Sequence, residues 1–149
     1  MSMLDKATLP AGRKLDALIA ERVMGWQTIQ YEEWPGSFVP MLWWPEGPSP
    51  QGRDLDRLED GRWAPWGLPA YSTDLAAAMA VWQHLRDSGR WCCLDIGSDY
   101  NFCWTLKLTP APPVPEPEGW KHEPAVIVDG EESLPLAICC VALMAITKD

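Results

Sequence analysis

Residues 134–146 constrain the fold more than any other segment, because all thirteen of them are apolar. Pro135 lies near the start of this run, where a missing backbone N–H costs a helix nothing, so we expect a helix over residues 133–147. The run is too short to cross a bilayer, which takes about 20 apolar residues. A helix with almost no polar side is buried all round, or its outer face meets another subunit.

A second helix is predicted over residues 72–87. Apolar residues recur there at helical spacing and make one apolar face: Leu75, Ala78, Met79, Trp82 and Leu85. Ser72 or Thr73 can cap the first turn with its hydroxyl, and Asp74 places a negative charge near the positive helix end. Asp74 would also repel a bound phosphate, so these residues favour capping over anion binding.

A first helix over residues 13–24 should end at Gly25, because glycine adopts the left-handed conformation without penalty. Strands are predicted at residues 28–31, 38–44, 91–96, 101–108 and 125–128. Pro40 limits the second of them to an edge or irregular strand. The strands at 91–96 and 101–108 should form an antiparallel hairpin. Residues 45–69 are expected to be mostly loop, with a short helical turn at 53–58.

These elements predict an α+β fold, with an antiparallel sheet of about three to five strands packed with three helices. A single domain is expected over residues 13–149, after a flexible leader at 1–12. It carries a proline- and tryptophan-rich insert at about 35–69 and a proline-rich loop at 109–120.

The formal net charge of −9, from 21 acidic and 12 basic residues, argues against a protein that binds the phosphate backbone of nucleic acid. The five cysteines are an odd number and include two adjacent pairs, which indicates free thiols in a reducing cytoplasm. Neither a signal peptide nor a membrane-spanning segment is expected. The prediction is therefore a cytoplasmic protein with no membrane and no nucleic-acid partner.

Catalysis and metal binding are both disfavoured by the residues available. His84 lies beside the apolar face of the second helix and His122 lies in a loop, and nothing in the sequence brings either one beside a thiol. No two cysteines have the Cys-x-x-Cys spacing typical of zinc ligands. We expect no catalytic residues, no metal site and no cofactor.

The ten tryptophans are the strongest departure from ordinary composition. Those in the proline-rich insert can stack on a planar ligand, anchor a protein partner, or cover the sheet as a small second core. A ligand site is predicted where these loops meet the strand that carries Trp104. Its candidate ligand-binding residues are Trp43, Trp44, Trp63, Trp66, Tyr71 and Trp104.

Three segments resemble the phage ABA-sandwich domain family, in the order and spacing of its members. They are Leu-Ile-Ala-Glu-Arg-Val-Met-Gly-Trp at 18–26, Pro-Ala-Tyr-Ser-Thr-Asp-Leu-Ala-Ala-Ala at 69–78 and Leu-Pro-Leu-Ala-Ile-Cys-Cys-Val-Ala-Leu at 134–143. The resemblance covers about residues 13–147. Cys140 replaces a basic residue usual in the family, and the proline-rich inserts are longer. The resemblance implies an α-β-α sandwich and a phage or prophage source, and it carries over no catalytic residues.

The working hypothesis is a phage-encoded accessory protein that binds without chemistry, either a small ligand such as a nucleotide or a host protein. The alternatives are a small hydrolase-type enzyme and a phage structural or assembly component. The apolar last helix and the excess of tryptophan also predict a homo-oligomer, most simply a dimer.

Overall fold

The computed structural model of this 149-residue chain describes residues 10–44, 54–98, 103–112, 115–116, 118–119 and 124–147. The helices are α1 (Arg13–Arg22), α2 (Leu75–Asp87) and α3 (Leu134–Thr147). The strands are β1 (Gln27–Trp34), β2 (Ser37–Trp43), β3 (Leu55–Arg57), β4 (Trp63–Pro65), β5 (Trp91–Ser98), β6 (Trp104–Pro110) and β7 (Val126–Glu131). The strands form one four-stranded sheet, β1-β2-β4-β3, and one three-stranded sheet, β5-β6-β7. The α+β prediction, with three helices and mostly antiparallel sheets, is confirmed.

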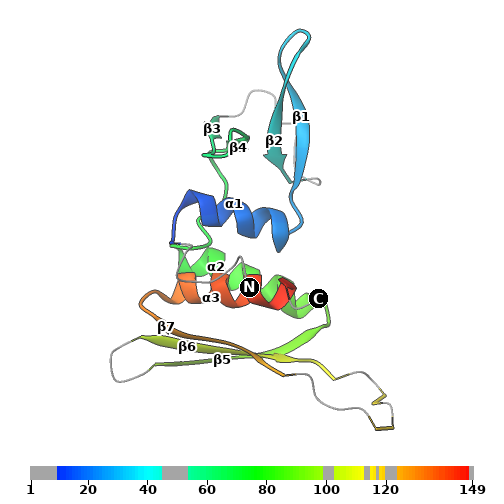
Figure 1. The fold of residues 1–149 in the computed structure, drawn as a ribbon, viewed down its shortest axis with the longest axis vertical. Coiled ribbons are helices and arrows are strands. Elements are labelled where there is room, and N and C mark those ends of the chain that lie inside the picture. Colours follow the sequence, from blue (N-terminus) through cyan, green and yellow to red (C-terminus); the bar gives the residue numbers. More distant parts are fainter. Residues whose placement is uncertain are drawn as a thin grey trace.

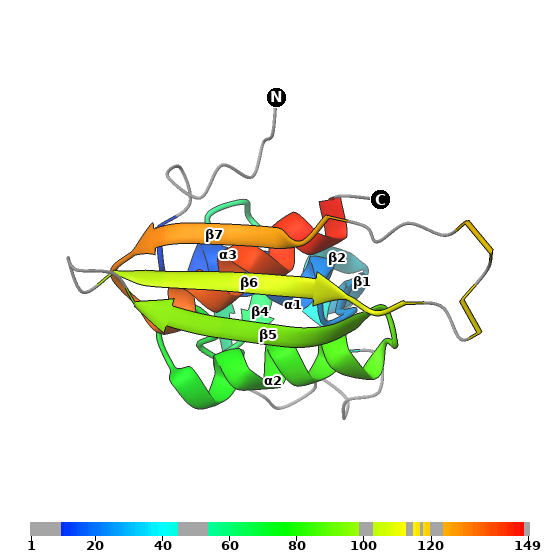
Figure 2. The same ribbon diagram turned by 90° about the horizontal axis from the view of Figure 1, so that it is seen from below.

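The helices lie between the two sheets (Figure 1). The three-stranded sheet forms one end of the molecule, α2 and α3 cover one of its faces, α1 lies over them, and the four-stranded sheet lies beyond α1. Seen from below, β5, β6 and β7 have no helix over them (Figure 2). The layer order therefore differs from an α-β-α sandwich, in which one sheet carries helices on both faces.

Helix α3 is enclosed by the other elements of its own chain. It packs against α2 at its side, against β6 and β7 below, and against α1 above. Residues 137–143 and Ala145 are all buried. The predicted helix is confirmed, and its apolar character is explained within a single chain, because each of its faces meets another element. A dimer is not needed to cover it and stays a prediction.

The three-stranded sheet carries an alternating pattern of buried and exposed residues. Leu106 and Leu108 on β6 are buried under the helices, whereas Lys107 between them is exposed. On the uncovered face, the Thr105 hydroxyl donates a hydrogen bond to Asp129 at 2.7 Å. The predicted hairpin is confirmed, since β5 pairs antiparallel with β6 from Trp91–Pro110 to Ser98–Trp104.

The four-stranded sheet corrects the helical turn predicted at residues 53–58, because residues 55–57 form strand β3. Strand β4 is the other regular element within residues 54–69, so that part is mostly loop as expected, and residues 45–53 lie outside the described residues. β3 pairs with β4, and β4 pairs with β2 where Trp63 lies opposite Met41. Strands of three residues are too short to show a periodicity of their own, and their partner β2 is distant in the sequence.

The sequence predicts an edge or irregular strand at Pro40, and β2 is not an edge strand, because β1 lies on one side of it and β4 on the other. β4 reaches β2 only at the Met41–Trp63 pair, so the second edge of β2 is not continuously paired beside Pro40. A missing N–H is tolerated where a ladder is interrupted in this way.

Helix α2 is capped by Asp74, not by Ser72 or Thr73. Asp74 has an extended backbone, and its carboxylate accepts a hydrogen bond from the Ala77 N–H at 3.1 Å. Ser72 is instead buried and used elsewhere, as described below. The end of α1 agrees with prediction, because Gly25 follows it with a φ of 88°.

Most of the predicted leader and part of the proline-rich loop lie outside the described residues. β6 runs through Pro110, so the described part of that loop begins at Ala111. Of the helices that the structure describes, none has the length and apolar character needed to cross a membrane.

Candidate binding site

The β1–β2 hairpin turns through Pro35 and Gly36. Proline at the first central position and a glycine with a φ of 81° at the second are typical of a type II turn. Gly36 is required there because a side chain strains this conformation. Trp34 pairs with Ser37 across the turn, and a bulge follows between Glu32 and Trp34. The sequence therefore fixes a tight end to the hairpin.

The end of this hairpin projects away from the rest of the protein (Figure 1). Met41 is the last residue of β2 that pairs with β4, and Ser37 lies four residues further out. At about 3.3 Å per residue, the paired strands extend roughly 13 Å beyond the sheet. Residues 32–38 are all exposed, and we call them the hairpin tip.

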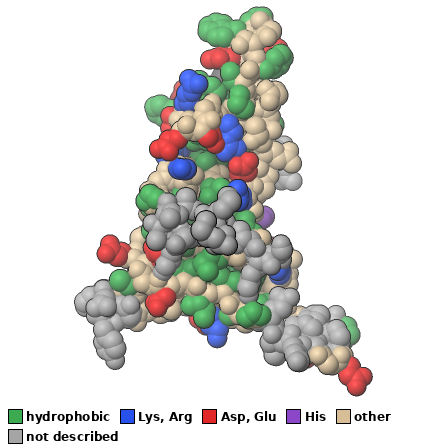
Figure 3. Space-filling model, in the orientation of Figure 1, with side chains coloured by type: hydrophobic (Ala, Val, Ile, Leu, Met, Phe, Trp, Pro, Cys, Tyr) green, Lys and Arg blue, Asp and Glu red, His purple; other side chains and the backbone are tan. Residues whose placement is uncertain are grey.

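Two large aromatic side chains lie on the hairpin tip. Trp34 is 68% exposed and Phe38 is 57% exposed. Figure 3 shows hydrophobic side chains gathered at the free end of the hairpin, with acidic groups next to them. The hairpin tip includes two exposed acidic residues, Glu32 and Glu33, and no Lys, Arg or His occurs from residue 27 to residue 44. Aromatic residues are enriched at protein–protein interfaces, so two exposed rings at one projecting end indicate a candidate interaction site.

The base of the same sheet contains two of the predicted tryptophans. Trp43 is buried at the end of β2, and Trp63 is half-buried on β4 beside Met41. The Arg57 guanidinium lies over the Trp63 ring, 5.6 Å from its centroid, and covers one face of the ring. These two rings therefore contribute to packing, as in the small second core weighed above.

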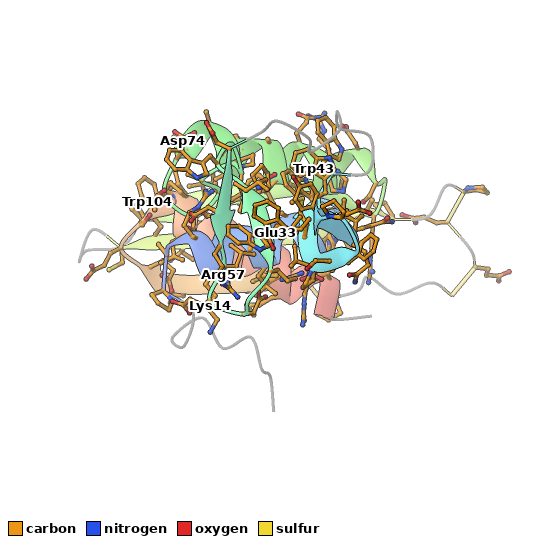
Figure 4. All side chains as sticks on the ribbon, turned by 90° about the horizontal axis from the view of Figure 1, so that it is seen from above. Lys14, Glu33, Trp43, Arg57, Asp74 and Trp104 are labelled. Atoms are coloured by element: carbon orange, nitrogen blue, oxygen red, sulfur yellow. The ribbon has the colours of Figure 1, made fainter. Side chains whose placement is uncertain are left out.

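The other predicted site residues are dispersed. Trp44 is exposed after β2, and Trp66 is 69% exposed, with its indole N–H donating to the Leu55 carbonyl at 2.8 Å. Tyr71 is buried before α2. Trp104 lies in the other sheet, and Figure 4 shows it well apart from Trp43. The helices separate the tryptophan loops from the Trp104 strand, so the structure does not bring the six predicted residues into one site.

A buried polar network joins α1 to the segment before α2. The Asp16 carboxylate, 1% exposed, accepts hydrogen bonds from the Ser72 N–H at 2.8 Å and the Ser72 hydroxyl at 2.7 Å. The Ser72 oxygen in turn accepts from the Gly12 N–H at 2.9 Å. Arg13 lies 3.8 Å from Asp16 and donates to the Leu68 carbonyl at 2.7 Å. Every group named is satisfied within the network, which indicates a structural role.

Tyr71 lies beside this network and should make the protein sensitive to alkali. Burial, together with the charges of Asp16 and Cys139, raises the pKa of Tyr71 from 10.0 to about 12. Burial likewise raises the pKa of Cys139 well above its usual value. Unfolding exposes these groups and lets them lose protons at lower pH.

We therefore expect the free energy of unfolding to fall at high pH. The contribution of Tyr71 is fully present below pH 10 and is lost as the pH rises through about 12. Urea unfolding measured from pH 8 to 12 should show this decline. Tyr71→Phe should make the fall above pH 10 shallower by about 1.4 kcal/mol per pH unit. An unchanged slope in that variant would contradict the assignment.

An open pocket of about 300 Å³ lies between α1 and the β3–β4 turn. Its lining combines apolar residues with equal numbers of basic and acidic ones: Lys14, Ala17, Leu18, Leu58, Glu59, Asp60 and Arg62. The Arg62 guanidinium is already bound, by Asp60 at 2.9 Å and by Glu21 at 3.1 Å. The charges that line the pocket therefore balance, and the pocket has no net charge that would select a charged ligand.

The remaining reactive side chains of the described residues do not gather into a centre. His84 is exposed on α2, Cys139 and Cys140 are buried in α3, and His122 lies outside the described residues. Within the described ranges, no three His, Cys, Asp or Glu side chains are placed to hold a metal ion. Cys92 and Cys93 are exposed on β5, and repulsion from Asp95 adds to desolvation in raising the pKa of the Cys93 thiol.

The hairpin tip was not among the predicted site residues. Trp34 and Phe38 lie on either side of the Pro35-Gly36 turn, residues 29–31 alternate weakly in polarity, and residues 39–42 are all apolar. A Pro-Gly pair between two short runs of strand-forming residues signals a hairpin, and an aromatic residue at its end is then exposed. Comparisons with protein-family models, curated proteins and solved structures give no match, so the resemblance to the phage ABA-sandwich domain family stays a prediction.

Proposed function

We propose that this chain is a non-catalytic binding module that recognises a protein partner with its hairpin tip. The observation that carries the proposal is the exposure of Trp34 and Phe38 at the end of a projecting hairpin. Interface hot spots are enriched in such aromatic anchors, which fill pockets on the partner. The turn and the paired strands hold the backbone of the two aromatic residues in place before binding, so little backbone freedom is lost on association.

The exposed area is large enough to matter for binding. Covering the exposed parts of one Trp and one Phe removes roughly 250 Å² of apolar surface from water. At about 25 cal/mol per Å², this contributes about 6 kcal/mol before the cost of association. The tip therefore supplies an anchor for an interface and needs further contacts around it to reach high affinity.

A protein partner fits this surface better than a nucleotide does. A base-binding site needs aromatic faces arranged around one pocket, and the exposed rings of Trp44 and Trp66 belong to separate segments, with Trp66 tied to Leu55. Glu32 and Glu33 would also repel a phosphate group. The resemblance to phage proteins supports a partner from a bacterial host.

Affinity capture tests the proposal. Immobilised wild-type protein should retain a partner from a host extract, and the double variant Trp34→Ala/Phe38→Ala should lose it, because truncating hot-spot aromatics typically weakens binding about 30-fold or more. The bound proteins are compared by quantitative mass spectrometry.

The matched control removes exposed apolar side chains elsewhere. Leu75 and Met79 are exposed on α2, away from the hairpin, and Leu75→Ala/Met79→Ala should retain the partner. Equal capture by the wild type and the hairpin variant would contradict the proposal.

A further inference from the structure

We infer that the surface receiving the hairpin tip is an apolar pocket on a protein whose rim carries Lys or Arg side chains. The inference rests on the proposed function and adds the chemistry of the partner. It follows from the position of two carboxylates relative to the exposed rings.

Glu32 lies directly beside the aromatic anchor. It pairs with Phe38 across the two strands, and side chains at paired positions are about 5 Å apart at their Cβ atoms. A pocket deep enough to take the Phe38 ring therefore brings its rim up to the Glu32 carboxylate. Glu33 lies in the bulge between Glu32 and Trp34, so a second carboxylate lies next to the paired Glu32 in the chain.

These carboxylates have no counter-charge on the hairpin. Residues 27–44 contain no Lys, Arg or His, and no ion pair joins Glu32 or Glu33 to another described residue. Docking the rings removes water from both carboxylates, which is unfavourable unless the partner supplies positive groups. A basic rim meets this need, and an acidic or purely apolar rim does not.

The same charges disfavour the other macromolecular surfaces that bind exposed aromatic residues. Anionic membranes attract basic segments and repel acidic ones. Nucleic acids repel them for the same reason, and the whole chain carries a net charge of −9. A basic-rimmed pocket on a protein is the surface that suits both the rings and the carboxylates.

Site-specific photo-crosslinking identifies the receiving surface. Full-length protein with p-benzoyl-phenylalanine in place of Phe38 is irradiated in host extract, and the crosslinked peptide is sequenced by mass spectrometry. The crosslinked segment is expected to adjoin Lys or Arg residues on the surface of the partner. A crosslink to an acidic or uncharged surface would overturn the inference, and no crosslinked protein at all would overturn the proposed function with it.

Binding rates then test the charge complementarity with the crosslinked partner, immobilised for surface plasmon resonance. Glu32→Lys/Glu33→Lys should lower the association rate constant about tenfold at low salt, and added salt should slow the wild type. Glu116→Lys/Glu118→Lys makes the same change in net charge at two exposed positions far along the chain, and it should leave the rate within about twofold.

The outcomes separate this inference from the proposed function. If Trp34→Ala weakens binding while Glu32→Lys/Glu33→Lys does not, the rim is not basic and the hairpin still binds a protein. If Glu32→Lys/Glu33→Lys and Glu116→Lys/Glu118→Lys slow association equally, the net charge of the protein alone sets the rate, and the inference is overturned. A membrane is tested by sedimenting the protein with phosphatidylcholine vesicles, with or without phosphatidylserine. If the wild type sediments with the vesicles and Trp34→Ala/Phe38→Ala does not, the tip binds a membrane and the inference is overturned.

Discussion

Replacing Asp16 with alanine should lower the free energy of unfolding by about 3–5 kcal/mol, the range for breaking a buried, paired charge network. The carboxylate accepts hydrogen bonds from both the N–H and the hydroxyl of Ser72, at 2.8 and 2.7 Å. Its loss leaves these donors buried without an acceptor, and each such group costs about 1–3 kcal/mol. It also removes the negative partner of Arg13 and opens a small cavity between α1 and the segment before α2.

Urea unfolding followed by circular dichroism measures this effect. Asp16→Asn keeps an oxygen acceptor and the side-chain shape, so it should lose less stability than Asp16→Ala. Asp54 is exposed, and its side chain makes no hydrogen bond to a described residue, so Asp54→Ala should change stability by less than about 0.5 kcal/mol. A loss below about 1 kcal/mol for Asp16→Ala would show that the network does not support the fold.

A second large effect is expected in α3. Ala142 is fully buried (0% exposed) in a helix that α1, α2, β6 and β7 surround. Ala142→Glu places a carboxylate where no water and no cation can reach it, and it also overpacks the site. We expect this variant to lose more than about 5 kcal/mol and to be largely unfolded, because that exceeds much of the stability of a typical domain.

The same substitution on α2 is the matched control. Ala80 is exposed, and Glu is a good helix former, so Ala80→Glu should stay within about 0.5 kcal/mol of the wild type. Thermal unfolding of the two variants side by side tests the layered arrangement directly. A folded Ala142→Glu variant would mean that one face of α3 is open to solvent.

Much of this fold can be predicted from local sequence patterns. The apolar run at 134–146 identifies a buried helix, Gly25 marks the end of α1, and the strands predicted at 91–96 and 101–108 correspond to β5 and β6. Each of these signals is contained in one segment. The fold class and the three helices follow from them.

Long-range pairing accounts for most of what could not be predicted. Strands β3 and β4 have three residues each and gain their stability from pairing with each other and with β2. Nothing within three residues specifies such a partner. The layer order depends on which faces of the helices meet which sheet, and a helix that is apolar all round gives no directional signal.

Ser72 shows how a local rule can mislead. A hydroxyl two residues before Asp74 is a reasonable helix cap by sequence, and the alternatives have nearly equal capping strength. The buried Asp16, 56 positions away, takes the Ser72 hydroxyl, and Asp74 then serves as the cap. Ser72 binds the buried Asp16 carboxylate and does not cap the helix, because an unpaired charge in the core costs more free energy than the loss of one helix cap.

No residue of the hairpin tip was among the predicted site residues, because tryptophan content alone does not show which rings lie beside a tight turn. The ring of Trp43 is buried and that of Trp104 lies in the other sheet, although sequence alone treats them like Trp34. Burial of a ring depends on which face of a sheet is covered, whereas a ring beside a tight hairpin turn has little protein to pack against. The Pro35-Gly36 turn is therefore the more informative signal.

The most direct test of the hairpin-tip proposal is calorimetric titration of the captured partner with wild-type protein and with Trp34→Ala/Phe38→Ala. We predict that the double variant binds at least about 100-fold more weakly, as expected for two hot-spot residues. Its thermal midpoint should stay close to that of the wild type, because both rings are exposed in the folded protein. An unchanged dissociation constant in a folded double variant would contradict the proposal.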